Sequence, residues 1–497
     1  MTTSASETID SAFLRQPTVK MLIGGQWVEA ASGKTFETYN PATGAVLTHV
    51  AEGDAEDINR AVAAARAAFE SGPWAKMTPS QRGKLLWRLA DLIEEHGEEL
   101  ALLETLDNGK PIRYSRASDV PLTADHFRYF AGWATKIEGE TIPVSIPNML
   151  TYTLREPLGV VGQIIPWNFP MQMASWKLAP ALAAGNTVVL KPAEQTPLTA
   201  LRIGELACEA GFPDGVVNIV PGYGQTAGAA LAAHPDVDKI AFTGSTEVGK
   251  KILQASAGNL KKVTLELGGK SPNIIFPDAD LKWAVRGALT AIYFNTGQIC
   301  TAGSRLFVHS SIYDETMSKL TEAANAMRVG AGVDPATEVG PIISQEQLAR
   351  VTGYIESGKS EGAVARAGGE RLGGDLASGY FLPPTVLDQV NDEMVVAREE
   401  IFGPVVVAMP FDDVEEVARR ANQSIYGLAA GVWTSDIKKA HKMVALLKSG
   451  VVWVNTYNQF DAAAPFGGYR QSGYGREMGH AVLDAYTQIK TAWINLR

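Results

Sequence analysis

The stretch VVGQIIPWNFPMQMASWKLAPALAAGNTVVLKP, residues 160–192, decides the fold. It begins and ends with a short run of Val, Ile and Leu followed by proline, and residues 171–185 between them have the composition of a helix. Two nearly continuous apolar strands joined by a helical crossover imply neighbouring parallel strands in one sheet.

The same alternation continues to residue 269. Strands are predicted at 160–166, 186–192, 216–222, 238–244 and 261–269. Helices are predicted between them at 171–185, 197–211, 224–234 and 245–259. This pattern predicts a doubly wound α/β domain with a parallel sheet, the arrangement of nucleotide-binding proteins. Residues 54–108 are amphipathic and helical, and we expect them to flank this domain.

A second α/β series follows residue 270. Helices are expected at 281–294 and 315–329, and strands at 304–310, 404–410 and 450–455. The loop that contains Cys300 lies between the two series, so a cleft between two domains would bring its thiol to the nucleotide.

Composition excludes several classes of protein. The 497 residues include two cysteines, too few for a disulfide framework or a four-ligand zinc site, and we expect no metal. A net charge of -10 disfavours nucleic acid. No apolar run approaches the roughly 18 residues of a membrane span, and the first 17 residues contain no apolar signal region. We expect a cytoplasmic protein without membrane or nucleic-acid partners.

In a doubly wound sheet the ligand binds outside the carboxyl ends of the strands. Asn168 could donate a hydrogen bond to an oxyanion, or simply cap the next helix. Lys191 and Glu194 could bind a ribose or lie solvated at the surface. Glu266, in an apolar strand, could be a general base with a raised pKa, or a carboxylate paired with a basic neighbour. Gly244 and Ser245 lie where a helix N-terminus would meet an anion.

Cys300 has small polar neighbours in FNTGQICTAGSR, which indicates a loop rather than an apolar stripe. A thiolate there would be a strong nucleophile toward a carbonyl carbon, although an inert cysteine is an equal alternative from the local sequence. Cys208 lies at helical spacing from Leu201, and we expect it to pack in the core.

Seven motifs together resemble the NAD(P)-dependent aldehyde dehydrogenase superfamily. They occur in the family's order and approximate spacing, and the resemblance runs from about residue 20 to the C-terminus. The motifs are PWNFP, TVVLKPAEQTP, FTGSTEVG, TLELGGKSP, FNTGQICTAGSR, EEIFGPV and PFGGYRQSGYGRE.

The resemblance implies a Rossmann-type cofactor domain, an α/β catalytic domain and a small β-arm that joins subunits. The corresponding segments are residues 1–132 and 154–266 for NAD binding, 267–468 for catalysis, and 133–153 with 480–497 for the arm. It makes Cys300 the nucleophile, Glu266 the general base and Asn168 the oxyanion donor. The implied cofactor contacts are Ile164, Ile165, Pro166, Trp167, Lys191, Glu194, Gly244, Ser245, Gln347, Glu400 and Phe402. The implied substrate tunnel contains Phe169, Trp176, Ile299, Phe460 and Phe466. Thr296 and Ile299 depart from the residues that many relatives carry.

The implied reaction oxidises an aldehyde to a carboxylic acid through a thiohemiacetal and a thioester on Cys300, which water activated by Glu266 hydrolyses. The alternatives are a CoA-acylating aldehyde dehydrogenase, which usually lacks this glutamate, a non-catalytic member of the fold, and a cofactor-free cysteine hydrolase that uses one of the seven histidines.

The aromatic tunnel favours apolar or aromatic aldehydes, and NTYNQFDAAAPFGG is similar to phenylacetaldehyde dehydrogenases. These tunnel segments contain no arginine that would bind the carboxylate of a semialdehyde. Glu194 favours NAD over NADP, with NADP left open, because a carboxylate repels a 2′-phosphate. The strand-like C-terminal segment resembles the family's subunit-joining end, so we expect a homo-oligomer, either a dimer or a tetramer.

Overall fold

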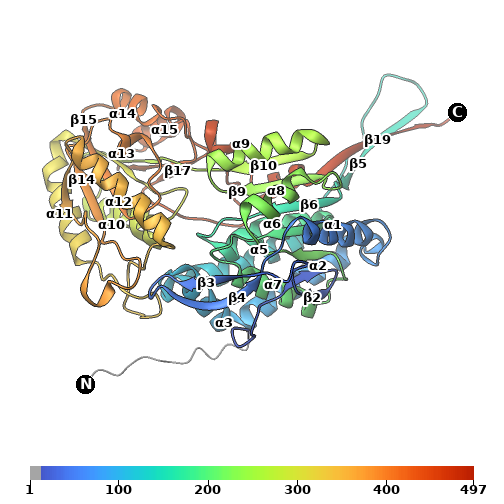
Figure 1. The fold of residues 1–497 in the computed structure, drawn as a ribbon. Coiled ribbons are helices and arrows are strands. Elements are labelled where there is room, and N and C mark those ends of the chain that lie inside the picture. The colour runs from blue at the N-terminus through green and yellow to red at the C-terminus, as the bar shows by residue number, and fades with distance from the viewer. Residues whose placement is uncertain (1–12) are drawn as a thin grey trace.

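Two large sheets covered by helices, with a long two-stranded arm, make up the fold (Figure 1). The computed structural model describes residues 13–497, so the start of the predicted NAD-binding domain, residues 1–12, lies outside the described residues.

The first sheet contains all five strands predicted between residues 160 and 269. Its strand order is β18 (Gly473–Tyr474), β10 (Lys262–Glu266), β9 (Lys239–Thr243), β6 (Val160–Ile164), β7 (Thr187–Lys191), β8 (Val217–Ile219), β1 (Met21–Ile23) and β2 (Gln26–Val28). The register pairs Ile164 with Lys191 and Thr243 with Glu266. The carboxyl ends of these central strands therefore finish together at one edge of the sheet.

This sheet is mixed, which corrects the expectation of a purely parallel one. The five central strands run parallel, but β1, β2 and β18 pair antiparallel at the two edges. These edge strands have only two or three residues each, too few to show a hydrophobic period in the sequence.

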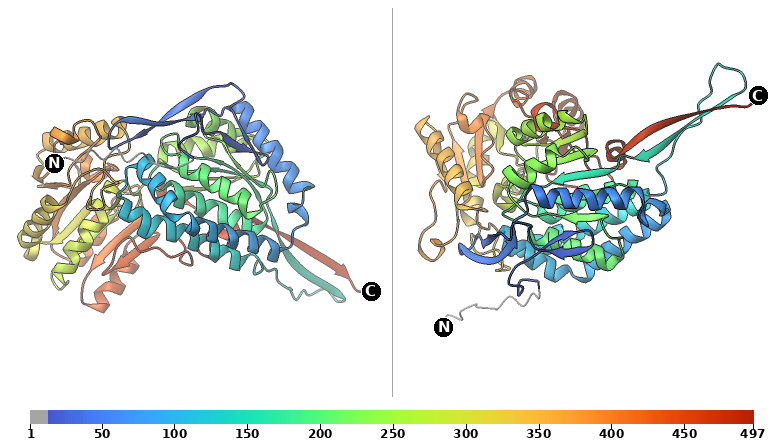
Figure 2. Two further views of the ribbon diagram at one scale, coloured as in Figure 1. Left: turned by 90° about the horizontal axis from the view of Figure 1, so that it is seen from below. Right: turned by 45° about the vertical axis from the view of Figure 1, so that its right-hand side comes forward.

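Helices cover both faces of the first sheet, as Figure 2 shows. On one face lie α1 (Ala55–Glu70), α8 (Ala229–Ala233) and α9 (Thr246–Ala255). On the other lie α6 (Pro170–Ala184) and α7 (Leu198–Ala210), with α2 (Pro79–Glu95), α3 (Gly97–Asn108), α4 (Ile112–Tyr114) and α5 (Val120–Trp133) outside them. The helix expected at 224–234 opens with a π-helical turn, Gly224–Gly228, before α8 begins.

Three of these helices, α1, α2 and α9, begin at polar side-chain caps that the sequence supplies. Asp54 and Asp57 form a capping box at the start of α1, and Thr78 and Gln81 form another at α2. Helix α6 is among the helices without such a cap, and its N-cap residue is Phe169. Nearly all of α6 is buried between the sheet and the outer helices, so tertiary packing stabilises this helix.

The second sheet lies in the part of the chain predicted to form the catalytic domain. Its strand order is β13 (Val364–Ala367), β14 (Thr385–Asp388), β15 (Val405–Phe411), β12 (Arg305–His309), β11 (Pro272–Ile275), β16 (Ala429–Trp433) and β17 (Val451–Val454). All pairs are parallel except β13 with β14. Its helices are α10 (Leu281–Tyr293), α11 (Tyr313–Ala326), α12 (Gln345–Ser360), α13 (Val395–Arg398), α14 (Val414–Ala421) and α15 (Ile437–Leu446).

The arm is the pair β5 (Met149–Pro157) and β19 (Thr487–Asn495), which projects from the rest of the molecule (Figures 1 and 2). A separate hairpin joins β3 (Thr35–Asn40) to β4 (Ala45–Ala51). The arm strands overlap both segments predicted for the arm, while the exact domain boundaries stay a prediction.

The prediction for Cys208 was wrong, because this residue is exposed. Helix α7 buries Leu201, Gly204 and Ala207 on its inner face, and Cys208 follows one position round the helix. Across residues 13–497, none of the helices has the length and apolar character that a membrane crossing would need.

Candidate active site

Cys300 lies in a loop that begins with an unusual backbone turn after α10. Asn295 (φ 45°) and Thr296 (φ 57°) are both left-handed, and Gly297 continues the turn with φ 71°. A Cβ at Gly297 would stand 2.1 Å from the Gly403 carbonyl oxygen, so only glycine fits there. The loop before Cys300 is therefore held tightly against the second domain.

Asn168 reaches this loop from the end of β6. Its side-chain Nδ2 donates to the main-chain oxygen of Gln298 across 2.9 Å, and its own main-chain oxygen accepts from Asn295 Nδ2 at 2.9 Å. The buried Asn168 amide thus contacts the cysteine loop and does not cap α6. One N–H of the amide remains for a further acceptor, such as a developing oxyanion.

The glycine pair after β10 lets two other groups approach. A Cβ at Gly269 would lie 2.4 Å from the Cys300 carbonyl oxygen, and a Cβ at Gly268 would lie 2.2 Å from Glu400 Oε2. The Gly269 N–H also donates to Glu400 Oε1 at 2.9 Å. The end of β10 is therefore packed directly against both Cys300 and Glu400.

Glu266, the last residue of β10, is buried, and neither of its carboxylate oxygens has a hydrogen-bond partner among the described residues. Burial raises the pKa of Glu266 well above its usual value, and the Glu477 carboxylate raises it further. Lys177 and Arg476 oppose this shift. A buried carboxyl group with a raised pKa and free oxygens is a credible general base.

The electrostatics around Cys300 keep its thiol protonated in the free protein. Desolvation raises the pKa of Cys300 to about 12, with smaller contributions from the Glu400 and Glu266 carboxylates. Burial likewise raises the pKa of Glu400 to about 7. The close contacts of Gly268 with Glu400 and of Gly269 with the Cys300 main chain bring both residues to the end of β10, whose last residue is Glu266.

The residues predicted to bind the cofactor gather at the carboxyl ends of β6 and β7. Ile164, Ile165, Pro166 and Trp167 continue β6, and Ile165 N–H donates to the Lys191 carbonyl oxygen at 3.2 Å. The Lys191 side chain is buried and donates to the carbonyl oxygens of Pro192 and Gly222, each at 2.7 Å.

Lys191 also forms an ion pair with Glu194, at 3.4 Å. Glu194 is partly exposed and lines a cavity of about 230 Å³ together with Tyr223 and Ser344. The Glu194 carboxylate, which faces a cavity beside the fixed Lys191 ammonium, can accept the hydrogen bonds that ribose hydroxyls donate. The residues present at this sheet edge therefore fit a dinucleotide.

The remaining cofactor candidates take two positions. Ser245 caps the N-terminus of α9, directly after Gly244, and is exposed. Across the cleft, Gln347 Nε2 donates to the Phe402 carbonyl oxygen at 2.8 Å, and the Phe402 ring meets Trp167 edge to face at 5.2 Å. Gln347 thus positions the left-handed Phe402 main chain (φ 59°), while Phe402 and Trp167 close the gap between the two halves.

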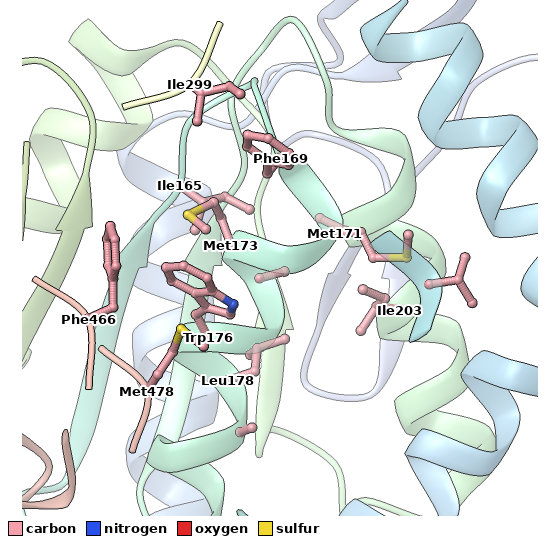
Figure 3. Close-up of a cluster of buried hydrophobic side chains, with 14 of the residues drawn as sticks. Ile165, Phe169, Met171, Met173, Trp176, Leu178, Ile203, Ile299, Phe466 and Met478 are labelled. Carbon is pink, nitrogen blue, oxygen red and sulfur yellow. The ribbon is translucent and has the colours of Figure 1, made fainter. Parts of the chain in front are cut away.

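Three of the predicted tunnel residues, Trp176, Phe460 and Phe466, form one aromatic cluster. Phe169 and Ile299 lie beyond one end of it (Figure 3). The rings of Trp176, Phe460 and Phe466 lie 5.3 to 6.1 Å apart. Figure 3 shows Phe169 and Ile299 at one end of the buried cluster, with Trp176, Phe466 and Met478 toward the other.

A cavity of about 390 Å³ opens beside this cluster and has polar walls as well. Besides Trp176 and Phe460, its lining includes Asp125, His126, Arg128, Gln172 and Asp461. The predicted tunnel segments contain no arginine, but the cavity is lined by one, Arg128. The Arg128 guanidinium is, however, already paired with Asp91 at 2.9 Å and Glu94 at 2.5 Å.

Sequence reasoning missed two charged residues beside Glu266, the predicted general base. Lys177 Nζ, buried in α6, forms a 2.6 Å ion pair with Glu477 and donates to Thr243 Oγ1 at 2.7 Å. A lysine inside the otherwise apolar helix MQMASWKLAPALAA was the available signal. Glu477 carried no such signal, because its partner is 300 residues away.

A second buried cation lies under the tunnel. Lys110 Nζ pairs with Asp119 at 3.0 Å and stands 4.1 Å from the centre of the Phe169 ring. No group of three or more His, Cys, Asp or Glu residues within 13–497 is arranged to hold a metal ion.

A thiol beside one buried and one half-buried carboxylate, at the carboxyl ends of a doubly wound sheet, fits an oxidoreductase that uses a dinucleotide and a covalent cysteine intermediate. The chain belongs to the aldehyde dehydrogenase family, which matches residues 27–492. The predicted fold class and enzyme class are confirmed by this membership.

Similar proteins agree over nearly the whole chain. The human mitochondrial aldehyde dehydrogenase is 54% identical, covering 97% of this chain and 93% of its own length. The mitochondrial benzaldehyde dehydrogenase of Antirrhinum majus is 54% identical, covering 95% and 88%. The structure of the NAD+ complex of an aldehyde dehydrogenase from Bacillus cereus is 58% identical, with a TM-score of 0.96 and 98% of each chain covered.

Proposed function

We propose that this aldehyde dehydrogenase uses NAD to oxidise apolar or aromatic aldehydes to carboxylic acids, with Cys300 as nucleophile, Glu266 as general base and Asn168 as oxyanion donor. The observation that carries the proposal is the hydrogen bond from Asn168 Nδ2 to the Gln298 carbonyl oxygen, which fixes the amide at the loop of Cys300. The donor is thereby held in place before the substrate arrives.

Cys300 gives its proton to solvent water and its sulfur attacks the aldehyde carbon, forming a C–S bond as the C=O π bond opens to a tetrahedral thiohemiacetal oxyanion. The free N–H of Asn168 and the main-chain N–H of Cys300 stabilise this oxyanion. Bound NAD would supply the hydride acceptor that oxidation of the tetrahedral carbon to a thioester requires. Glu266 then takes a proton from water, whose oxygen attacks the remaining thioester and releases the acid and the Cys300 thiolate.

The raised pKa of Cys300 indicates that ionisation of the thiol needs a positive charge from a bound ligand. A thiol with a pKa of about 12 is rarely ionised at neutral pH, and two carboxylates beside it oppose ionisation. A positive charge placed near the sulfur would lower its pKa. The positively charged nicotinamide ring of the oxidised cofactor is such a charge, so we expect the thiol to become more reactive when NAD binds.

The geometry of the strand ends supports the cofactor contacts that we propose. Ile164 to Trp167, Lys191 and Glu194 would hold the adenosine half, with Gly244 and Ser245 at the pyrophosphate. Glu400 and Phe402, the latter held by Gln347, would contact the nicotinamide ribose. Glu194 favours NAD because a 2′-phosphate would approach its carboxylate.

The aromatic cluster supports the choice of substrate. Trp176, Phe460 and Phe466 offer ring faces and edges to a flat apolar group, and the name of the Antirrhinum majus relative specifies benzaldehyde. Phenylacetaldehyde is the aldehyde that we would test first. Arg128 is already paired with two carboxylates, so it is poorly suited to bind a semialdehyde's own carboxylate.

We also propose a cytoplasmic homotetramer. Apolar side chains on and beside the arm strands are exposed in a single chain, namely Leu150, Leu154, Ile489, Trp493, Ile494 and Leu496. A two-stranded ribbon is marginally stable by itself, and exposed apolar patches of this kind mark interfaces. Size measurement by light scattering separates a tetramer from a dimer.

The test is NADH formation, followed by absorbance, with phenylacetaldehyde, benzaldehyde, hexanal and betaine aldehyde in the absence of CoA. We expect fastest turnover with an aromatic aldehyde, and loss of turnover in Cys300→Ala by at least about a thousandfold. Cys208→Ala is the matched control, because Cys208 is exposed on α7, and it should keep full activity. Activity that requires CoA would overturn the role of Glu266.

A further inference from the structure

Thr296, four residues before Cys300, has a backbone conformation that threonine rarely adopts. Its φ is 57° and ψ 32°, and its side chain is buried, with the residue only 1% exposed. The left-handed region is unfavourable for most residues and especially for one branched at Cβ. Contacts around Thr296 must therefore hold it in this conformation.

Two hydrogen bonds, one at Thr296 and one at Gln298, join the turn to one segment of the second domain, residues 340–343. Thr296 Oγ1 donates to the Gly340 carbonyl oxygen at 3.1 Å, and Ile343 N–H donates to Gln298 Oε1 at 2.9 Å. Both side chains are buried, so water competes little for either bond. The left-handed turn is thus tied down at Thr296 and again at Gln298.

The segment that receives these bonds is itself fixed. A Cβ at Gly340 would lie 2.3 Å from the Gly109 carbonyl oxygen, so the main chain packs directly against the end of α3. Ile342 N–H donates to the Tyr380 carbonyl oxygen at 2.9 Å. Thr296 therefore anchors the cysteine loop to a part of the protein that cannot easily move with it.

The turn also determines where the oxyanion donor points. Asn295, on one side of Thr296, donates to the Asn168 carbonyl oxygen, and Gln298, on the other side, accepts from the Asn168 side chain, both at 2.9 Å. A change in the Thr296 backbone would move both partners of Asn168. It would also move Cys300, which is only two residues beyond Gln298.

We propose that Thr296 is a positioning residue for the reaction. Its hydroxyl stabilises a strained left-handed turn, and the turn sets the Gln298 carbonyl, and through it the Asn168 amide, relative to the Cys300 sulfur. This inference rests on the proposed function, in which Cys300 and Asn168 act on the aldehyde.

The test compares Thr296→Val, which removes the hydroxyl and keeps the branched Cβ, with Thr296→Ser, which keeps the hydroxyl. Thr316→Val is the matched control, because Thr316 is also buried and its Oγ1 also donates to a main-chain oxygen, that of Ile312, at 2.7 Å. Thr316 lies on α11, outside the residues of the site.

Two quantities are measured for each variant. One is the rate of alkylation of Cys300 by iodoacetamide, determined by peptide mass spectrometry with the exposed Cys208 as internal reference. The other is kcat and KM for NADH formation with hexanal. We expect T296V to lower both the alkylation rate and kcat about tenfold, the effect of losing one buried hydrogen bond, with KM changed less than about threefold. T296S and T316V should stay within about twofold of the natural protein.

The inference is overturned if T296V matches T316V in alkylation rate and kcat, or if T296S loses as much activity as T296V. If T296V does not fold, Thr296→Ala gives the same comparison. The proposed function fails in a different way, by turnover that survives in Cys300→Ala, so the two failures are distinguishable.

Discussion

The side-chain amide of Asn168 donates to the main-chain oxygen of Gln298 across 2.9 Å, and this bond joins the end of β6 in the first sheet to the loop of Cys300. It uses one of the two N–H groups of the amide. The orientation of the second N–H is fixed by the first, so the proposed oxyanion donor needs no rearrangement when the substrate reacts.

Replacement of Asn168 by aspartate should reduce kcat by about a hundredfold to a thousandfold, the usual effect of removing one oxyanion donor. The carboxylate would also face the Gln298 carbonyl oxygen, so two acceptors would meet where a hydrogen bond exists now. Steady-state NADH formation measures the effect. Asn259→Asp is the control, because Asn259 lies on the far side of the first sheet, near Pro235. A loss of less than about threefold would contradict the assigned role.

Replacement of Glu266 by glutamine should stop thioester hydrolysis while leaving the first oxidation intact. We expect a rapid burst of NADH close to one equivalent per active site, followed by turnover at least about a hundredfold slower than in the natural protein. Stopped-flow absorbance separates the two phases. A variant that lacks both burst and turnover would show that Glu266 is needed before the thioester forms.

Replacement of Glu477 by glutamine should move the pH profile toward acid. Glu477 raises the pKa of Glu266, while Lys177 lowers it, so removing the Glu477 charge lowers the pKa of Glu266 on both counts. In the proposed mechanism Glu266 acts as a carboxylate, and its ionised fraction would then rise at lower pH. We expect the rising limb of kcat against pH to shift down by about one unit.

The control for this shift is Glu247→Gln, which removes an exposed carboxylate from α9 and should leave the profile unchanged. A glutamine at 477 can still accept the hydrogen bond from Lys177, but it leaves a buried cation without its carboxylate, so we expect the free energy of unfolding to fall by about 3–5 kcal/mol. A limb that stays in place, or moves to higher pH, would show that Glu266 does not govern it.

Replacement of Glu194 by glutamine should weaken the preference for NAD. The variant removes the carboxylate that a 2′-phosphate would approach and leaves Lys191 without its ionic partner. We expect the ratio of kcat/KM for NADP to that for NAD to rise about tenfold. Glu209→Gln, an exposed change on α7, should leave the ratio as it is.

Replacement of Gly269 by alanine should damage both stability and activity. The new Cβ would stand 2.4 Å from the Cys300 carbonyl oxygen, so one main chain or the other must move. Overpacking of this kind typically costs about 1–3 kcal/mol in the free energy of unfolding. We expect a lower melting temperature and at least a tenfold lower kcat, about the effect of 1.4 kcal/mol in the barrier.

Gly353→Ala is the matched control, because nothing lies within 4 Å of a Cβ at this position in α12. Alanine is the better helix former, so this variant should be slightly more stable and fully active. If both alanine variants behave alike, the contact between Gly269 and Cys300 has no catalytic importance.

The sequence predicted the central strands of the first sheet because each is a continuous apolar run that ends in glycine or proline. The strand predicted at 238–244 is β9 (Lys239–Thr243), for example, and its neighbour at 261–269 is β10. Strand pairing between residues far apart in the chain left no comparable pattern in the sequence. Gly473 and Tyr474 form an edge strand beside β10 through only two residues, so the antiparallel edge could not be foreseen.

The catalytic candidates were recognisable because their residue types are rare in their local surroundings, as for Glu266 at the end of an apolar strand. What tunes these residues was less visible. Glu477 acts on Glu266 through a fold in which residues more than two hundred positions apart are neighbours. Cys208 shows the opposite limit, because a shift of one position round α7 separates a buried side chain from an exposed one.

The return of residues 473–477 to the first sheet has a consequence for the order in which the enzyme matures. During synthesis the N-terminal regions of a chain emerge first and domains tend to fold as units. The first sheet can form most of its strands long before Gly473 and Glu477 have been made. Until then Lys177 is a buried cation without its carboxylate, an arrangement that is strongly unfavourable. Synthesis of the last tenth of the chain thus completes the edge of the sheet and places the Glu477 charge near Glu266. A nascent chain that binds the nucleotide before then would not yet be an active enzyme.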